Sequence, residues 1–385
     1  MAKRKICIIV ASRANYGRIK SLLAAVDQHP DLELQLIVGA SGLLYRFGQV
    51  IKVIEKDGFK VTAKVYSIVE GDNLTTMAKS TGLAIQELAT LFENLKPDVV
   101  VTVADRFETM GTAVAASYMN ICLAHTQGGE VSGSIDESVR HAITKLAHLH
   151  FPANQEAAEI LKRMGEDPAR IFVTGCPAID LAAQAPKDIG PEFFKRYGGV
   201  GPAIQGDQPY LVVLQHPVTT EFGQGMDQIN HTLDAIMQTG MQTVWLWPNV
   251  DAGSDDVSKG LRMFRERNPD APIHFYRNFT PEDYVTLIAN TACLVGNSSS
   301  GIREGAFLGT PTVNIGSRQN NRTRGPNVID VGYDRAEIAA AIKQQLAHGP
   351  YPSAPIYGDG TAGQQMAEVL ASVDVSIQKA FFINR

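Results

Sequence analysis

The sequence is poor in cysteine and has no apolar run of membrane-spanning length. Its only cysteines are Cys7, Cys122, Cys176 and Cys293. They are widely spaced and form no CxxC pair, which indicates reduced thiols in a cytoplasmic protein rather than a disulfide framework. The early apolar run, residues 6–11, is too short for a signal peptide, and we expect it to form the first strand.

An excess of charge of one sign is also absent. The formal net charge of −5 is spread over interspersed acidic and basic residues, so neither a nucleic acid nor a membrane surface is an expected partner. A small anionic metabolite remains compatible with this charge. The length of 385 residues and the hydrophobic content of 44% are sufficient for two domains with ordinary cores.

The motifs of several enzyme classes are missing. Residues 12–18, SRANYGR, follow the first strand where a dinucleotide-binding sheet would carry GxGxxG. His141 and His148 do not have HExxH spacing, and the loop at 296–301, GNSSSG, has neither the Walker lysine nor the GxSxG pattern. NAD, a metal ion, NTP hydrolysis and a serine nucleophile are therefore not expected, and no cofactor is predicted.

Short apolar segments alternate with amphipathic helical patterns in the first half of the chain. Strands are predicted at 6–10, 34–38, 99–103, 121–124 and 171–174. Helices are predicted near 18–26, 43–56, 75–95, from 135 onward, and at 155–164. This rhythm is typical of a doubly wound parallel α/β sheet.

The second half repeats the alternation. Strands are predicted at 211–214, 243–247, 273–276, 293–295 and 312–315, and helices near 228–238, 257–267, 281–289 and 363–372. Residues 184–209 contain four prolines and five glycines, which indicates a linker. We therefore expect domains at 1–183 and 210–362, a linker at 184–209, and a C-terminal helix and tail at 363–385.

Residues 125–151 place a Gly-Gly turn, three acidic residues and several histidines around the start of one helix. A helix is expected to begin at Ile135, because Ser134 and Glu137 form a capping-box pattern. The acidic residues around this start fall at the carboxyl end of a strand, where parallel sheets bind ligands.

Three of these acidic residues are candidates for a functional role: Glu130, Asp136 and Glu137. The two on the helix could equally serve only to stabilise its N-terminus. The Gly-Gly pair at 128–129 favours a site, because it would let a ligand approach the backbone beside Glu130.

Two further strand ends carry charged residues. Arg13 lies beside a helix start, where a planar, always charged guanidinium suits a diphosphate, although a surface ion pair is an equal alternative. Asp105 and Arg106 follow the strand at 99–103 and would either touch a ligand or pair with other side chains.

In the second half, two loops could meet a ligand. The loop at 296–301 places small residues and hydroxyls before a helix, which favours an anion site built from backbone N–H groups; a serine-rich helix cap is the alternative. His216 follows the strand at 211–214, although a lone histidine can also be structural.

Taken together, the sequence resembles the hydrolysing UDP-N-acetylglucosamine 2-epimerases over nearly its whole length. The matching motifs are SRANYGR, ADRFE, GGEVSGSIDESVRHAITKLAHLHF, GCP, QHPVTT, WPNVDAGS, GNSSSGIRE and VNIGSRQNNRTRGPNVI. The motifs GTRPE, HVEAGLR and HRREN, typical of non-hydrolysing epimerases, are not found. The resemblance implies a GT-B fold of two doubly wound Rossmann-like domains, with a UDP-sugar in the cleft between them.

The resemblance also implies roles for individual residues. Substrate-binding residues would be Arg13, Arg106, Gln127, Asn249, Ser298, Ser299, Gly301, Glu304 and Arg318. Among them Glu304 would bind the ribose hydroxyls, and Arg106, with His216, would approach the diphosphate. Relatives commonly have Glu at position 127. The amide of Gln127 cannot carry a proton at neutral pH, so it is expected only to hydrogen-bond the sugar.

The implied reaction converts UDP-N-acetylglucosamine to N-acetylmannosamine and UDP through a glycal intermediate. The C2 hydrogen has no adjacent carbonyl to acidify it, so its removal requires a positioned base while Arg and His stabilise the departing UDP. Neighbouring carboxylates can act as acid and base if burial raises only one pKa. The catalytic candidates are Asp105, Glu130, Asp136, Glu137 and His216.

Three alternatives stay open. The same chemistry could act on UDP-2,4-diacetamido-2,4,6-trideoxyglucose, as in close relatives of legionaminic acid pathways. A GT-B glycosyltransferase and a non-catalytic nucleotide-sugar sensor are the alternatives of other classes. A homodimer or homotetramer is expected.

Because the sequence has neither GxGxxG nor metal-ligand spacing, turnover of a UDP-sugar is expected to need neither NAD nor a divalent ion. The measurement is UDP release by desalted protein with and without EDTA. A loss of activity in EDTA that a divalent salt restores would contradict this expectation.

Overall fold

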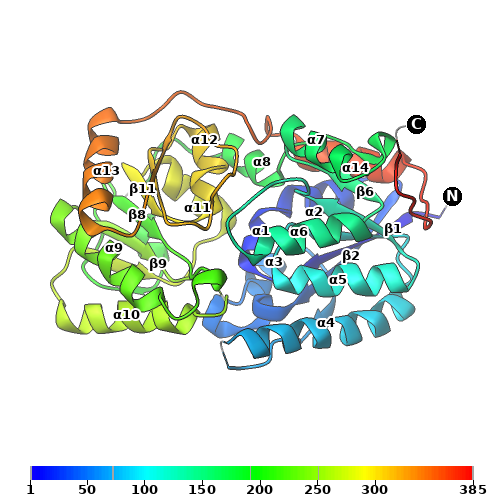
Figure 1. Cartoon of the computed structure of the whole chain (residues 1–385), viewed down its shortest axis with the longest axis horizontal. Coiled ribbons are helices and arrows are strands. Elements are labelled where there is room, and N and C mark those ends of the chain that lie inside the picture. The colour runs from blue at the N-terminus through cyan, green and yellow to red at the C-terminus, as the bar shows by residue number, and fades with distance from the viewer. Residues whose placement is uncertain (1, 72, 191, 250, 384–385) are drawn as a thin grey trace. The chain divides into compact units, whose positions relative to one another are not determined.

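A computed structural model describes residues 2–71, 73–190, 192–249 and 251–383 (Figure 1). The described residues form two compact units. Within the described residues, unit 1 comprises 2–131, 135–181 and 357–383, and unit 2 comprises 132–134 and 182–356. No helix in these described ranges is long and apolar enough to cross a membrane.

Unit 1 is built on a parallel sheet with the strand order β3-β2-β1-β4-β5-β6. The strands are β1 (Arg4–Val10), β2 (Leu32–Gly39), β3 (Val61–Val65), β4 (Val99–Val103), β5 (Cys122–Thr126) and β6 (Leu149–Phe151). β4, with the sequence VVVTV, is buried at every position, as expected for a β-branched strand covered on both faces.

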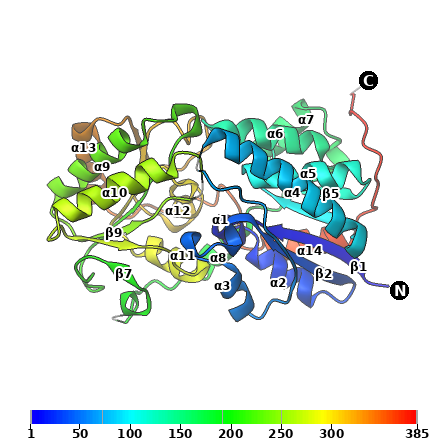
Figure 2. The ribbon, with the colours of Figure 1, turned by 90° about the horizontal axis from the view of Figure 1, so that it is seen from below.

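Helices cover both faces of this sheet (Figure 2). They are α1 (Arg13–Gly17), α2 (Lys20–Gln28), α3 (Ile51–Lys56), α4 (Leu74–Leu95), α5 (Phe107–Tyr118), α6 (Ile135–Leu146), α7 (Gln155–Arg163), α8 (Pro177–Ala183) and α14 (Ala362–Ser372). Successive residues of β1 point to opposite faces. Ile6 and Ile8 pack with α2, α3 and α14, whereas Cys7 and Ile9 pack with α4, α5 and α6.

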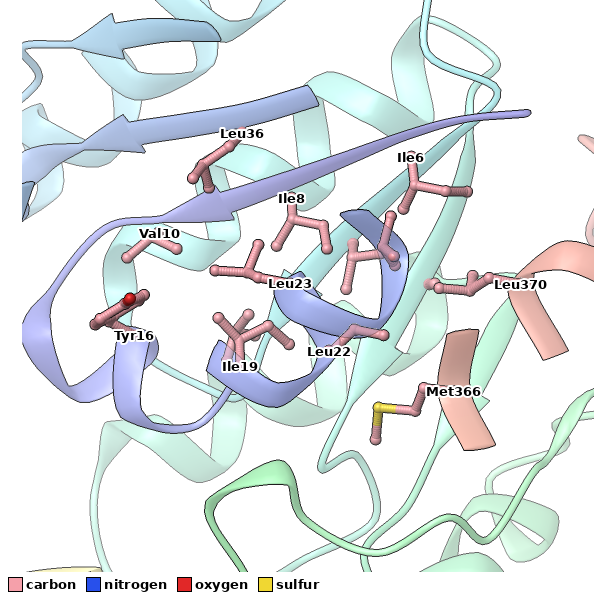
Figure 3. Packing of buried hydrophobic residues seen from close by; sticks show 14 of the residues in the cluster. Ile6, Ile8, Val10, Tyr16, Ile19, Leu22, Leu23, Leu36, Met366 and Leu370 are labelled. Carbon is pink, nitrogen blue, oxygen red and sulfur yellow. The ribbon is translucent and has the colours of Figure 1, made fainter. Parts of the chain in front are cut away.

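The last helix, α14, is part of the unit 1 core rather than a separate tail. Figure 3 shows Met366 and Leu370 directed toward Leu22 of α2 and Ile6 of β1. All four side chains are fully buried. The predicted separation of 363–385 from the first domain therefore differs from the structure, because α14 supplies one wall of that domain's core.

Unit 2 contains a second sheet with the order β13-β12-β11-β8-β9-β10-β7. Its strands are β7 (Gly199–Val200), β8 (Leu211–Leu214), β9 (Thr243–Leu246), β10 (Ile273–Tyr276), β11 (Cys293–Gly296), β12 (Thr312–Ile315) and β13 (Val328–Val331). Its helices are α9 (Gly225–Thr239), α10 (Ser254–Arg267), α11 (Pro281–Ala289), α12 (Glu304–Leu308) and α13 (Arg335–His348). Only β7 is antiparallel among these strands, and it pairs with β10.

The two sheets share one topology. Numbering β8 to β13 as a series of six gives the order 3-2-1-4-5-6, the same as in unit 1 and that of a Rossmann-type sheet. The predicted pair of doubly wound sheets is therefore confirmed.

Two predicted elements of the first half differ from the structure. The helix at 43–56 is shorter, since Gly48 adopts the left-handed conformation and α3 begins only at Ile51. No strand forms at 171–174. There Ile171 alone bridges to His150 of β6 before the chain turns at Gly175.

The predicted linker at 184–209 belongs to unit 2. Its Phe193, Phe194 and Ile204 are buried against β8 and β9, so aromatic anchors outweigh the proline and glycine content. Pro191 of this segment and Val250 of the WPNVDAGS motif lie outside the described residues.

Several elements were not predicted. α5, α13, β3, β13 and the short helix α8 have no counterpart among the expected ranges, whereas α12 is the helix expected after the loop at 296–301. β3 and β13 are sheet edges with partly exposed side chains, which weakens their apolar pattern.

A fully buried histidine lies on the fifth strand of unit 1. The Nε2 of His125 is 2.8 Å from the carbonyl oxygen of Ala104, and its Nδ1 is 3.3 Å from the Thr144 hydroxyl. A carbonyl only accepts, so Nε2 carries the proton of the neutral ring. Burial lowers the pKa of His125 to about 3, although the Ala104 hydrogen bond opposes this shift.

This buried histidine predicts acid sensitivity. The pKa of His125 is lower in the folded protein than in the unfolded chain. As the pH falls, the unfolded chain therefore binds this proton first. The stabilisation is complete above about pH 6.5 and is lost on going down toward the folded pKa, by up to ~1.4 kcal/mol per pH unit. Urea unfolding of wild type and His125→Gln between pH 7 and pH 5 is the measurement.

We expect the free energy of unfolding to depend less steeply on pH in His125→Gln than in wild type. The matched control is His348→Gln, at an exposed histidine of α13, which should leave the wild-type slope unchanged. An equal slope in wild type and His125→Gln would contradict the prediction.

Candidate active site

In each unit the strand order reverses between two neighbouring parallel strands. These are β1 and β4 in unit 1, and β8 and β11 in unit 2. Connections leave such a pair toward opposite faces, so the carboxyl ends of the two strands border a crevice that binds ligands in open α/β sheets. Most of the predicted site residues follow these four strands or the neighbouring β5.

Asp105 follows β4 and is buried, at 4% exposure. One carboxylate oxygen accepts a hydrogen bond from Nη2 of Arg140 on α6, and the other lies 3.9 Å from Nη1 of Arg18. Burial alone would lower the pKa of Arg140, but Asp105 and Glu130 together raise it above the ordinary value. The end of β4 therefore carries a buried ion pair.

Arg106 is paired with a side chain of its own helix. Its Nε lies 3.2 Å and its Nη2 3.3 Å from the two carboxylate oxygens of Glu108, and both side chains are buried. This is the pairing that the sequence left open as an alternative, and a role at a diphosphate stays a proposal. Glu108 was not among the predicted residues, although it lies in the quoted ADRFE motif.

Gln127 follows β5 with a left-handed backbone, φ 61°, and is fully buried. Its Nε2 donates to the Sγ of Cys176 at 3.3 Å. The predicted contact of this amide with a sugar is untested. Glu130, three residues on, is 5% exposed.

Packing within unit 1 leaves no room for a side chain at Gly129 and little room at Gly128. A Cβ on Gly129 would lie 2.1 Å from the Ala157 carbonyl oxygen, and one on Gly128 3.0 Å from both His125 Nδ1 and Thr144 Oγ1. Steric contact with the protein itself therefore explains both glycines, and close approach of a ligand is not needed to account for them.

Asp136 and Glu137 lie in the first turn of α6, as predicted, and both are half-buried. Glu137 Oε1 is 3.9 Å from the Nε2 of His141, one turn further along. Arg140, in the next turn, brings this helix to the end of β4. Arg13 is the first residue of α1, whose N-cap Ser12 accepts from the Asn15 N–H.

In unit 2, an asparagine side chain joins the ends of β8 and β11. Asn297 Oδ1 accepts from the His216 backbone N–H at 2.7 Å, and its Nδ2 donates to the His216 carbonyl at 2.8 Å. The His216 Nδ1 accepts from the Asn249 backbone N–H at 3.2 Å, which places the proton of the neutral ring on Nε2. Nε2 is thus the donor nitrogen of a 4% exposed ring.

The serine loop after β11 forms a 3-10 turn, Ser299–Gly301, and the expected helix follows it as α12. Ser298 caps this turn through the Ser300 N–H, so the cap alternative holds for Ser298, while Ser299 is buried. Gly301 is needed because a Cβ there would lie 2.5 Å from Thr312 Cγ2. Glu304 begins the five-residue helix α12 and is 8% exposed.

Arg318 also reaches the end of β11. Its Nη1 donates to the Asn297 carbonyl at 3.2 Å. The preceding Ser317 donates to Glu221, whose other oxygen accepts from the Tyr333 hydroxyl at 2.8 Å. Glu221 thus holds the loop that carries Arg318.

Side-chain contacts bring some of the predicted residues together in two groups, whereas Arg106 and Gln127 contact other partners and Arg13 lies at the start of α1. In unit 1, Arg140 connects Asp105, Glu130 and the helix of Asp136 and Glu137. In unit 2, Asn297 contacts both His216 and Arg318, and the His216 ring accepts a hydrogen bond from the Asn249 backbone. Sequence reasoning missed Arg140, Asn297 and Glu221, although all three lie in the quoted motifs or directly after one of them.

The described parts of the chain contain no group of three or more His, Cys, Asp or Glu side chains that could hold a metal ion. The chemistry available at the two strand-end groups consists of carboxylates, guanidinium groups, amides, hydroxyls and one imidazole. Such groups can transfer protons and bind anions.

Comparison with known proteins gives a consistent result. The sequence profile of the UDP-N-acetylglucosamine 2-epimerase family matches residues 24–371. The chain is 33% identical over 377 residues to the UDP-N,N'-diacetylbacillosamine 2-epimerase (hydrolyzing) of Legionella pneumophila, covering 97% of both chains. It is 31% identical over 385 residues to the UDP-N-acetylglucosamine 2-epimerase of Neisseria meningitidis, covering 98% of both.

Solved structures show the same fold. The crystal structure of UDP-GlcNAc 2-epimerase from Neisseria meningitidis bound to UDP-GlcNAc superposes with a TM-score of 0.78 at 17% identity, over 95% of this chain and 99% of that one. The Methanocaldococcus jannaschii enzyme gives a TM-score of 0.77 at 18% identity, with the same coverage. The predicted GT-B type of fold is confirmed. With the profile match over most of its length, the chain belongs to the UDP-N-acetylglucosamine 2-epimerase family.

Proposed function

We propose that the protein is a hydrolysing 2-epimerase that converts UDP-N-acetylglucosamine to N-acetylmannosamine and UDP. The observation that carries the proposal is the set of four carboxylates that Arg140 and α6 bring to the strand ends of unit 1: Asp105, Glu130, Asp136 and Glu137. Relatives named as hydrolysing epimerases match nearly the whole chain, which supports the hydrolytic outcome.

The first step is an elimination. A carboxylate removes the C2 proton, the C1–O bond to the diphosphate breaks, and UDP leaves with the bonding electrons. The leaving oxygen gains negative charge, which a guanidinium or an N–H donor stabilises. The Nε2–H of His216 is suited to this role because Nδ1 already accepts from Asn249.

The second step adds water to the glycal. The hydroxyl bonds to C1 and a proton returns to C2 on the opposite face, which gives the epimer as a free sugar. One carboxyl group must therefore donate a proton where another has accepted one.

In unit 2, we propose that the serine loop, Glu304 and Arg318 bind the nucleotide. Ser299 is buried beside the β11 strand end, and Arg318 is held there through Asn297. Arg13 and Arg106 would serve the diphosphate, for which Arg106 must exchange part of its pairing with Glu108.

The function is tested by incubating the protein with UDP-N-acetylglucosamine in heavy water without an acceptor. We expect UDP and N-acetylmannosamine that carries deuterium at C2. Release of UDP-N-acetylmannosamine would indicate a non-hydrolysing epimerase, slow loss of N-acetylglucosamine a transferase, and no product a sensor. Retention of the original C2 hydrogen would exclude the elimination.

Asp105→Asn should lower kcat by at least ~10²-fold, the lower range for a general acid or base. The matched control is Asp207→Asn, at an exposed aspartate of unit 2, which should keep wild-type kcat. Initial rates of UDP release for both variants are the measurement. An Asp105→Asn variant as active as the control would remove Asp105 from the catalytic set.

Gln127 and Glu130 are expected to have different roles, Gln127 in binding the sugar and Glu130 in the chemical step. Gln127→Ala should mainly raise KM, by about tenfold or less, since it loses one neutral hydrogen bond to the sugar. Glu130→Gln should mainly lower kcat, because it removes a titratable group. Michaelis curves for both variants decide the assignment, which is wrong if Gln127→Ala abolishes turnover while Glu130→Gln leaves it intact.

A second substrate is favoured by the Legionella relative, whose name specifies UDP-N,N'-diacetylbacillosamine. The same elimination and water addition would apply to this sugar. The ratio of kcat/KM for the two UDP-sugars, measured on one preparation, identifies the preferred substrate.

A further inference from the structure

Arg140 is one of the largest completely buried side chains of the protein. It lies on α6, one turn after Asp136 and Glu137, and its guanidinium has no exposed surface. Arginine remains charged in proteins, so burying it requires compensating negative charge.

The carboxylates of the proposed reaction supply that compensation. Nη2 of Arg140 donates to the Asp105 carboxylate, and Nη1 donates to the Glu130 carbonyl oxygen at 2.8 Å. The negative charges of Asp105, Glu130 and Asp136 all act on the guanidinium. The Arg140 guanidinium thus interacts electrostatically with three of the four carboxylates assigned to the proposed reaction.

Other charged or titratable groups of the described residues also act on this cluster. Arg18, which follows α1, lies 3.9 Å from the second oxygen of Asp105. His125 of β5 and His141 of α6 both interact electrostatically with Arg140, and burial lowers the pKa of each. Neither histidine therefore adds a positive charge near neutral pH.

We propose that Arg140 is a positioning residue of the epimerase reaction, which holds Asp105 ionised and fixes the Glu130 loop against α6. This role rests on the proposed function. Arg140 itself is covered by protein, so it acts through Asp105 and not on the substrate. Without it, neighbouring carboxylates would repel one another and favour protonation of Asp105, the form that cannot accept the C2 proton.

The geometry distinguishes arginine from lysine at this position. The planar guanidinium donates in two directions at once, to the side chain of Asp105 after β4 and to the backbone of the Glu130 loop. A lysine would retain the charge but not this fixed fork. Arg140→Lys should therefore keep part of the activity, and Arg140→Met should keep less.

The first measurement is kcat against pH for wild type, Arg140→Lys and Arg140→Met. Loss of the positive charge should move the acidic limb of the Arg140→Met profile to higher pH by roughly one unit or more, the effect of removing an opposite charge at contact distance. KM should change by about twofold or less, because no substrate contact is lost. Arg163→Met, on an exposed face of α7, is the matched control and should keep the wild-type profile.

The second measurement is a double-mutant cycle with Asp105→Asn. If Arg140 acts through Asp105, then Arg140→Met should lower kcat by less than about twofold in the Asp105→Asn background, although it lowers kcat strongly in wild type. The double variant leaves neither member of the pair as an unpaired buried charge, so it also controls for misfolding of Arg140→Met. Equal losses in both backgrounds, or an unshifted acidic limb, overturn the proposal.

Failure of the proposed function gives a different result. If wild type releases UDP from neither UDP-sugar, the epimerase assignment fails by itself. The effect of Arg140 on the ionisation of Asp105 is then measured by NMR titration of protein with ¹³C-labelled aspartate carboxyl groups. The Asp105 signal is assigned by its absence in Asp105→Asn. An Asp105 signal that titrates at higher pH in Arg140→Met than in wild type supports this effect, and identical titrations overturn it.

Discussion

Charged side chains that are removed from water must be paired, and this constraint shapes the carboxyl edge of the unit 1 sheet. Arg140 pairs with Asp105, and Arg106 with Glu108, in positions that exclude solvent. Breaking one partner of such a pair leaves an uncompensated buried charge, which costs about 3–5 kcal/mol. The strand ends are therefore fixed by charge as well as by apolar packing.

The same constraint operates beside β6. Glu166 is buried and contacts His150, Lys145 and Lys379. Burial alone would raise the pKa of Glu166, but these three partners lower it to about 2. Lys379 also donates to the carbonyl of Thr144 on α6, so a residue near the end of the chain supports the helix that carries Asp136 and Glu137.

Backbone conformation also shapes the carboxyl edge of the unit 1 sheet. Ala104 and Gln127 are the first residues after β4 and β5, and both have φ 61°, a left-handed value that costs a residue other than glycine about 1–2 kcal/mol. Each is held by a hydrogen bond to the neighbouring strand, Ala104 N–H to Thr126 at 3.3 Å and Gln127 N–H to Phe151 at 2.8 Å. These two turns direct Asp105 and the 128–130 loop away from the line of their strands.

The sequence predicted the sheets well because buried parallel strands are continuous apolar runs with clear bounds. Strands 99–103, 211–214, 273–276 and 312–315 match their predicted ranges. It predicted poorly where local composition and tertiary packing disagree. The segment at 184–209 looked like a linker from its prolines and glycines, yet Phe193 and Phe194 anchor it in a core.

The site was predictable in its residue types and strand ends, but not in its pairings. Charge and spacing identified Asp105, Glu130 and Arg106, whereas nothing in the sequence distance shows that Arg140 meets Asp105, 35 residues away. The glycines at 128–129 illustrate the reverse case. A role toward a ligand was a reasonable prediction, but contacts with Ala157 and His125 account for them.

The two units use one topology for different chemistry. At the β1–β4 edge the charged groups are paired with one another, Arg140 with Asp105 and Arg106 with Glu108. At the β8–β11 edge hydrogen bonds fix both a backbone and a ring: Asn297 holds the backbone of His216, and a backbone N–H fixes the imidazole tautomer. The charged Arg318 reaches the same strand end through the Asn297 carbonyl. A Rossmann-type strand order thus leaves the chemistry to the few residues that follow each strand, and the two units carry different residues there on the same topology.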